Sequence, residues 1–178
     1  MLTTENTALI VIDFQGKLAQ LMHNRESLFH AAASMIQGIK ALNIPMLVTE
    51  QNPDRIGPTI PEIAPLLEEP PIPKLSFSCC EEDVFMDRLK AMNRGQILIT
   101  GIETHICVYQ TAADLTSLGY EVQVVADAVS SRTEENRNIG LNRIQHVGAS
   151  LTSVETVLFE LLGTAANDTF KDILKIIK

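Results

Sequence analysis

Short apolar runs alternate along the chain with stretches in which apolar residues recur at helical spacing. Continuous runs of strand length occupy residues 8–12, 45–49, 97–99, 122–126 and 147–151. Between and after them, apolar positions three and four residues apart indicate helices, as at Leu28, Ala32 and Met35. Runs that are apolar on both faces are typical of a parallel sheet. The pattern predicts a three-layer α/β/α fold, with a parallel Rossmann-like sheet and helices on both faces. We expect this sheet to be six-stranded, one strand more than the five runs.

The length of 178 residues suits a single domain, and we find no internal repeat, so we expect one domain over residues 1–178. Residues 51–73 interrupt the alternation with seven prolines. We interpret this stretch as an ordered loop that passes over a site, because long loops inside compact domains are usually functional.

Polar residues follow several predicted strands. Asp13, Glu50 and Asp127 each end an apolar run, and a turn at 101–107 follows another. The carboxyl ends of parallel strands share one edge of a sheet, where ligands bind. We therefore expect these residues to meet at one rim.

Cys107 is the strongest candidate for chemistry. It follows a strand and begins a helical pattern, where backbone N–H groups and the helix dipole favour a thiolate. A lone cysteine is more often a buried filler, and we interpret Cys79 and Cys80 as structural or incidental. Asp13 could act as a general base toward the thiol, and Lys74 could keep that carboxylate ionised.

Composition excludes several classes of partner. The formal net charge is −8 and no basic cluster occurs, so nucleic acid and anionic membranes are not expected as partners. No apolar run is long enough for a membrane span, and no secretory signal is apparent. Three cysteines without metal-type spacing indicate free thiols in the cytoplasm and no metal site. No nucleotide-binding glycine motif occurs, so no cofactor is expected.

Several short motifs, taken together, resemble the isochorismatase-like cysteine hydrolases, over almost the whole chain and in family order. Other segments are most similar to the isochorismatase-domain-containing branch of that superfamily. The first set is Ile-Asp-Phe-Gln at 12–15, Pro-Lys at 73–74 with Phe-Ser at 77–78, and Gly-Ile-Glu-Thr-His-Ile-Cys-Val at 101–108; the second set is 48–51, 125–128 and 130–132.

The resemblance implies roles for particular residues. Asp13, Lys74 and Cys107 match the Asp–Lys–Cys triad of the family. Its cis peptide bond falls here between Ile102 and Glu103, and the Glu103 and Cys107 amides would form the oxyanion hole. By position, the residues that would line a substrate pocket are Phe14, Gln51 and Phe77. A small-molecule substrate and a homo-oligomer are also implied.

The implied reaction is hydrolysis of a C–N amide-type bond through a covalent thioester. The metal-binding motif of the family's nicotinamidases is absent from Glu50-Gln51-Asn52-Pro53, which argues against both a metal and nicotinamide. Two alternatives stay open. One is the vinyl ether hydrolysis of true isochorismatases, which can proceed without the cysteine. The other is a catalytically weak or silent member that acts as an interaction or redox-sensing protein.

Overall fold

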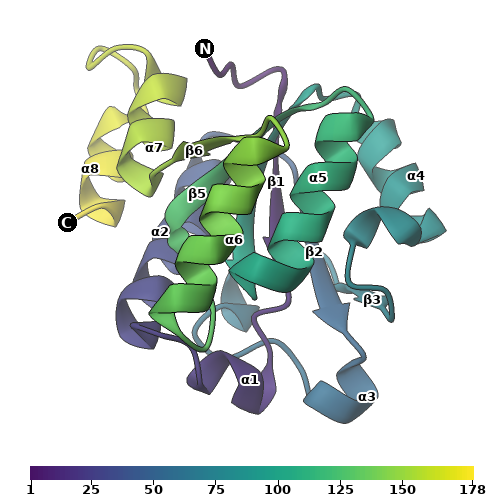
Figure 1. Ribbon diagram of the computed structural model, residues 1–178. Helices are drawn as coiled ribbons and strands as arrows, with labels where there is room; N and C mark the ends of the chain where they lie inside the picture. Colours follow the sequence, from purple (N-terminus) through teal and green to yellow (C-terminus); the bar gives the residue numbers. More distant parts are fainter.

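The computed structural model describes residues 1–178. Six parallel strands form one sheet in the order β3-β2-β1-β4-β5-β6, seen in Figure 1 behind α5 and α6. The strands are β1 (Thr7–Ile12), β2 (Met46–Gln51), β3 (Ile72–Lys74), β4 (Gln96–Ile102), β5 (Glu121–Ser130) and β6 (Ser150–Thr152).

Helices cover both faces of this sheet, so the predicted three-layer fold is confirmed. One face carries α2, α7 and α8, and the other carries α4, α5 and α6. The helices are α1 (Gly16–Gln20), α2 (Arg25–Ala41), α3 (Pro53–Ile56), α4 (Asp83–Met92), α5 (Tyr109–Ser117), α6 (Glu134–His146), α7 (Val154–Leu162) and α8 (Phe170–Ile176), with 3-10 turns η1 (Ala64–Leu66) and η2 (Cys79–Glu81) and a π-helical turn η3 (Thr104–Val108).

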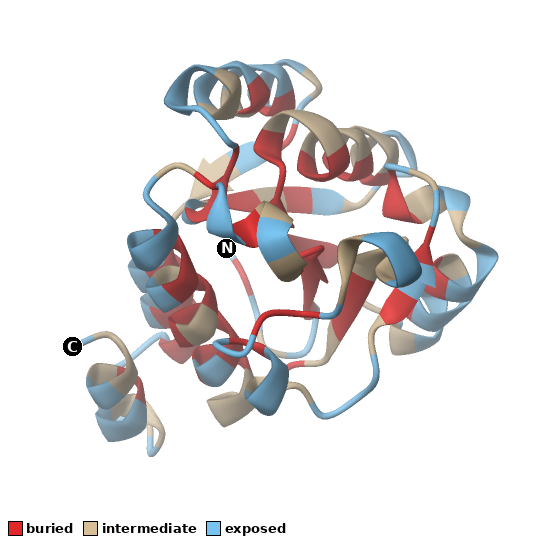
Figure 2. Cartoon of the chain, turned by 90° about the horizontal axis from the view of Figure 1, so that it is seen from below, coloured by how far each residue is buried: buried red, intermediate tan, exposed pale blue.

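The apolar run of β1 explains why this strand lies at the centre of the sheet. Leu9 and Val11 point into the core beneath α2 and α7, whereas Ile10 and Ile12 point into the core beneath α4 and α5. All four side chains are fully buried. Because successive side chains of a strand alternate between faces, a strand covered on both sides must be apolar at every position. Figure 2 shows the result, with red strands between helices whose outer faces are blue.

Helix α2 follows its predicted pattern and ends where the sequence indicates. Its buried face includes Leu28, Ala32 and Met35, and Asn43, the residue after the C-cap, takes a left-handed backbone with φ of 55°. Asparagine tolerates that conformation better than most residues, which is why it often ends helices. At 17 residues α2 is the longest helix, and none of the helices combines the length and apolarity needed to cross a membrane.

The stretch 51–73 differs from the prediction, because it is not all loop. It contains the short helix α3 and the turn η1, and Ile72–Lys74 joins the sheet as β3. The proline at 73 hid this strand from the sequence pattern. Proline is tolerated here because β3 is an edge strand, where the missing N–H removes no bond to a further strand. Lys74 is therefore held in the sheet and not in a loop.

Candidate active site

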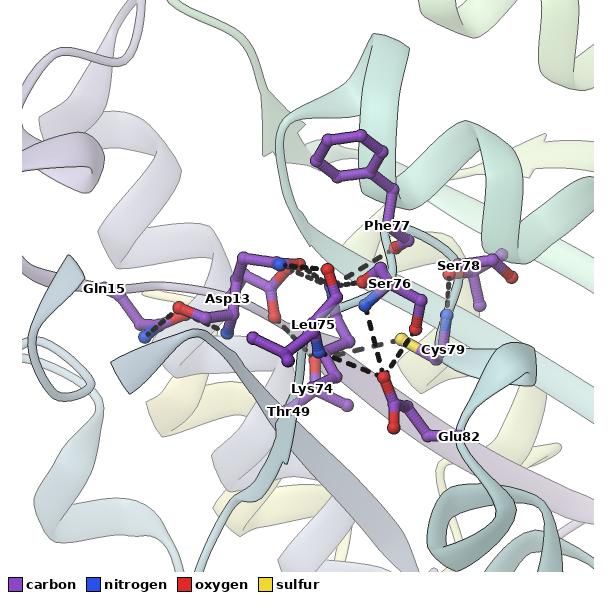
Figure 3. Close-up of polar contacts among 12 residues, drawn as sticks. Asp13, Gln15, Thr49, Lys74, Leu75, Ser76, Phe77, Ser78, Cys79 and Glu82 are labelled. Atoms are coloured by element: carbon purple, nitrogen blue, oxygen red, sulfur yellow. Dashed lines mark hydrogen bonds and ion pairs between the residues drawn. The ribbon is translucent and has the colours of Figure 1, made fainter. Parts of the chain in front are cut away.

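Asp13 and Lys74 meet over the carboxyl end of the sheet. Asp13 directly follows β1 and Lys74 ends β3, and these strands lie on either side of β2. The Lys74 ammonium nitrogen lies 2.7 Å from Asp13 Oδ2, and the two side chains are only 0% and 3% exposed. Figure 3 shows them at the centre of a dense polar network. A charge pair this deeply buried needs a full set of partners to be tolerated.

The backbone at Asp13 turns the chain out of β1. Its φ is 55°, in the left-handed region that aspartate tolerates better than most residues. Its N–H still donates to the carbonyl of Thr49 at 3.2 Å, which keeps it registered against β2. Its Oδ1 accepts a hydrogen bond of 2.8 Å from the Thr49 hydroxyl, and its Oδ2 has no partner other than the Lys74 ammonium.

The Lys74 ammonium is surrounded by oxygen atoms. Besides Asp13, it donates to Gln51 Oε1 at 2.6 Å and to the carbonyls of Ser76 and Phe77 at 3.1 and 3.2 Å. Burial alone lowers the pKa of this amine, but the negative charge of Asp13 and its hydrogen bond with the amine act against burial, and the pKa is raised. Lys74 is therefore a fixed positive charge, which excludes an amine nucleophile at this position.

Glu82 holds the loop that supplies these carbonyls. Its Oε1 accepts from the Leu75 and Ser76 amides at 3.0 and 3.2 Å and from the Ser76 hydroxyl at 2.6 Å. The pKa of Glu82 is lowered, mainly by the Ser76 hydroxyl. The loop that cups the ammonium is thus anchored from outside by an ionised carboxylate.

Cys107 reaches the same region from β4 through η3. It is 7% exposed and lies in a π-helical turn, whereas the sequence predicted the first turn of an α-helix. The peptide bond between Ile102 and Glu103, just before this turn, is cis, and the Glu103 N–H has no hydrogen-bond partner. Gly101 allows β4 to pass close to the end of β1, because a Cβ there would lie 2.3 Å from the carbonyl oxygen of Ile12.

Burial overturns the expectation that the helix start favours a thiolate. Removal from water raises the pKa of the Cys107 thiol to about 12, and the negative charge of Asp13 adds to this effect. Lys74 opposes it only in part. The local dipole at a helix start is weaker than the desolvation of a buried thiolate. The resting cysteine is therefore a neutral thiol beside an ion pair.

Cys79 belongs to this network, although the sequence suggested a structural or incidental role. It is fully buried, and its thiol donates to the Thr49 hydroxyl at 3.8 Å. Its amide donates to the Thr111 hydroxyl at 3.0 Å. Burial raises its pKa to about 11, and the charges of Lys74 and Asp13 both act on it. No sequence signal distinguishes it from Cys80, which is partly exposed.

Two polar pairs fasten the η3 turn to the residues that follow β5. The buried Glu103 carboxylate accepts from the Arg132 amide at 3.0 Å and from its guanidinium Nε at 3.1 Å. The His105 ring nitrogen Nδ1 lies 2.9 Å from the Ser131 hydroxyl. The His105 side chain thus helps to hold the turn in place. Gly140 of α6 lets the helix touch this turn, since a Cβ there would lie 2.7 Å from the backbone nitrogen of His105.

Glu50 and Asp127, which were expected at the rim, accept hydrogen bonds from other parts of the chain. The Glu50 carboxylate accepts from the amide and hydroxyl of Thr59, both at 2.7 Å. Asp127 does not end its strand, because β5 continues to Ser130. Its carboxylate instead accepts from the Val154 amide at 3.0 Å, at the start of α7. A bulge between β4 and β5 allows this extension, and no pattern in the sequence indicates it.

The three residues expected to line a substrate pocket lie in different settings. Phe14 is 1% exposed and packs in the core beneath α2, whereas Phe77 is 55% exposed. The side-chain amide of Gln51 is hydrogen-bonded within the protein, since Nε2 donates to the Leu75 carbonyl at 2.7 Å while Oε1 accepts from Lys74.

No group of three or more His, Cys, Asp or Glu side chains comes together as a possible metal site.

Comparisons with known proteins agree with this architecture. Residues 7–156 match the Isochorismatase domain. The chain is 40% identical to the secreted isochorismatase effector Isc1 of Phytophthora sojae, over 99% of this chain and 87% of the relative. It is 39% identical to isochorismatase domain-containing protein 2 of Xenopus laevis, over 97% of this chain and 83% of the relative.

Among solved structures, one described as MAR1 ribonuclease from Caenorhabditis elegans superimposes with a TM-score of 0.93 at 35% identity, covering 99% of this chain and 91% of the other. The alternation of strands and helices, the motifs at the strand ends and these matches lead to one conclusion: the chain belongs to the isochorismatase family of hydrolases.

Proposed function

We propose that the protein hydrolyses a small molecule with Cys107 as nucleophile, and that it cleaves a C–N amide-type bond through a thioester. The observation that carries this proposal is the buried Asp13–Lys74 ion pair, whose charges act directly on the Cys107 thiol. Perturbed groups that share a buried cluster are typical of catalytic sites.

In the first half of the reaction, Asp13 accepts the thiol proton as the sulfur attacks the carbonyl carbon. A general base is needed because the resting thiol is neutral, with a pKa raised to about 12. The carbonyl oxygen becomes an oxyanion, for which we propose the amides of Glu103 and Cys107 as donors. Removing one such donor typically slows a reaction by ~10²–10³-fold.

In the second half, the tetrahedral intermediate collapses. The C–N bond breaks, protonated Asp13 gives its proton to the leaving nitrogen, and a thioester to Cys107 remains. Water then attacks the thioester while Asp13 accepts one of its protons. The carboxylic acid leaves, and the proton on Asp13 returns to the cysteine sulfur. Lys74 keeps its proton throughout and offsets the negative charge that develops nearby.

Intact-mass spectrometry on a panel of primary and secondary amides tests this proposal. We expect an acyl adduct on Cys107 of the wild-type protein, and loss of both adduct and turnover in the variant Cys107→Ala. Cys80→Ala is the matched control, because Cys80 lies outside the Asp13 network and should keep full activity. Turnover that persists in Cys107→Ala would exclude the thiol mechanism.

Vinyl ether hydrolysis is the second enzymatic candidate, favoured by the name of the Phytophthora relative. It is distinguished by the same variant, since this reaction does not require the cysteine. Cleavage of isochorismate by Cys107→Ala at the wild-type rate would favour it over amide hydrolysis.

A silent member of the family that binds a partner or senses oxidants is the non-enzymatic candidate. The neutral resting thiol favours a silent member, since a thiol that is not ionised turns over slowly without a well-placed base. The same raised pKa disfavours oxidant sensing, because oxidants react with the thiolate.

The nematode neighbour is described as a ribonuclease. A formal net charge of −8 disfavours a polyanionic substrate here, and incubation with single-stranded RNA tests it.

Two further expectations rest on composition and family. We propose a cytoplasmic location because all three cysteines are free thiols, although the Phytophthora relative is described as secreted. We also propose a homo-oligomer, which size-exclusion chromatography with light scattering would detect.

A further inference from the structure

Strand β2 lies directly beneath the ion pair and contributes two side chains to it. Because β2 separates β1 from β3, the contact between Asp13 and Lys74 must pass over the end of β2. Thr49 and Gln51 are two residues apart on this strand, so their side chains point to the same face. One reaches each member of the pair: Thr49 donates to Asp13, and Gln51 accepts from Lys74.

The Thr49 hydroxyl donates its single hydrogen bond to Asp13. Its oxygen accepts from the Cys79 thiol at 3.8 Å, and its proton goes to Asp13 Oδ1 at 2.8 Å. Thr49 is 1% exposed, so water does not compete for these bonds. Oδ1 is thereby occupied by a neutral donor, and Oδ2 is left to the Lys74 ammonium. The two oxygens of the carboxylate are no longer equivalent.

Gln51 is oriented by equally specific contacts. Lysine can only donate and the Leu75 carbonyl can only accept, which fixes the amide with Oε1 on Lys74 and Nε2 on Leu75. Its backbone is clamped by Gln15, which is fully buried and whose Oε1 accepts from the Gln51 amide at 2.6 Å. The Gln15 Nε2 donates to the Gly57 carbonyl at 2.8 Å, which completes this support.

We propose that Thr49 and Gln51 are positioning residues for the Asp–Lys pair, an inference that rests on the proposed function. When Asp13 takes the thiol proton it loses its charge, and with that charge its attraction for Lys74. Gln51 and the carbonyls of Ser76 and Phe77 keep the ammonium in place during this interval. Thr49 keeps Oδ1 engaged by donating to it, so that Oδ2 is the oxygen that accepts and returns the proton.

The test uses iodoacetamide as the probe, because alkylation of Cys107 requires no knowledge of the substrate. Peptide mass spectrometry gives the second-order rate constant for Cys107 between pH 4 and pH 9. In the wild type we expect the rate constant to fall at the acid end of this range, an acid limb where alkylation has lost its general base. Thr49→Val removes a donor to the ionised carboxylate, so the limb should move up by about one pH unit and the plateau should fall about tenfold.

Three further variants complete the design. Thr49→Ser should restore both the limb and the plateau, because it keeps the hydroxyl. Gln51→Met should lower the plateau about tenfold without moving the limb, since it acts on the ammonium and not on the base. Thr152→Val is the matched control, a strand threonine of β6 whose hydroxyl has no hydrogen-bond partner, and it should change neither quantity.

The outcomes separate this inference from the proposed function. If wild-type Cys107 reacts no faster than Cys80 at any pH, the proposed nucleophile fails. If wild-type Cys107 reacts with an acid limb and Thr49→Val keeps the same limb and plateau, the role of Thr49 fails alone. Should Thr49→Val not fold, an unchanged plateau in Gln51→Met would overturn the inference, and a tenfold loss would support it.

Discussion

A lysine–carboxylate pair lies near each end of β2, and the two pairs differ in nearly every respect. At the amino end, Lys40 and Glu68 are 3.1 Å apart with side chains 31% and 74% exposed, beside a cavity of about 780 Å³. At the carboxyl end, Lys74 and Asp13 are 2.7 Å apart and almost completely buried. None of the residues that line that cavity is a member of the Asp13–Lys74–Cys107 group.

This contrast teaches that an open cavity alone is not enough to identify a candidate active site. An exposed pair is screened by water and contributes ~0–1 kcal/mol to stability. It therefore neither shifts the pKa of neighbouring groups nor needs further hydrogen bonds to be tolerated. A buried pair must be held by further hydrogen bonds, and its charges act on every group nearby. Cys79 and Cys107, whose pKa values are raised, and the network of Thr49, Gln51 and Glu82 are found only at the carboxyl end.

The largest effect should come from removing one member of the buried pair. Lys74→Met leaves the Asp13 carboxylate buried without a counter-charge, so the free energy of unfolding in urea should fall by about 3–5 kcal/mol. The double variant Asp13→Asn with Lys74→Met should recover much of that stability, because no lone charge remains. It should not recover alkylation of Cys107. A single variant as stable as the wild type would mean that the pair is not buried as described.

A smaller effect should follow from Gly101→Ala, which tests how closely β4 approaches β1. The added Cβ would lie 2.3 Å from the Ile12 carbonyl oxygen, on a residue with φ of 144°. We expect a loss of about 1–3 kcal/mol in urea unfolding. Gly119→Ala is the control, since φ there is 91° and nothing lies within 4 Å. Equal losses in the two variants would contradict the close approach.

The pH dependence of stability should reveal the buried thiols. Burial raises the pKa of Cys79 to about 11 and that of Cys107 to about 12, from 9.0. Above pH 9 the unfolded chain ionises these thiols while the folded chain keeps them protonated, so stability falls as the pH rises toward 11 or 12. Each thiol contributes a slope of at most about 1.4 kcal/mol per pH unit.

Urea unfolding at pH 8 and pH 10.5 measures this slope. The double variant Cys79→Ala with Cys107→Ala should make the slope shallower without abolishing it, because burial also raises the pKa of Cys80 to about 12. Its stability at pH 8 should be lower than that of the wild type. An equally steep decline in that variant would assign the pH dependence to other groups.

The smallest effect should come from the exposed pair. Lys40→Met removes the same ammonium as Lys74→Met, but from a position 31% exposed. We expect a change of less than about 1 kcal/mol in unfolding and no change in the alkylation of Cys107. A loss comparable to that of Lys74→Met would remove the distinction between the two ends of β2.

Local patterns in the sequence predicted much of the scaffold but little of the network. The continuous apolar run of β1 and the helical spacing of α2 depend only on neighbouring residues, so these elements were predicted correctly. Strand β3 was missed because Pro73 and its neighbours are typical of loops. Thr49 could have been singled out by its place at the end of β2, two residues before Gln51, but its partners could not. They come from β1 and β3, and the strand order decides that they are adjacent.

The sequence by itself determined the α/β architecture, the family and the positions of Asp13 and Cys107 after predicted strands, whereas the place of Lys74 at the end of β3 emerged only from the fold. Only the tertiary structure decided the state of these groups. Proximity to a helix start predicts an ionised thiol, but burial beside a carboxylate makes it neutral. The physical reason is that hydrophobic periodicity is a local property of the chain, whereas desolvation and charge pairing depend on which distant segments fold against each other.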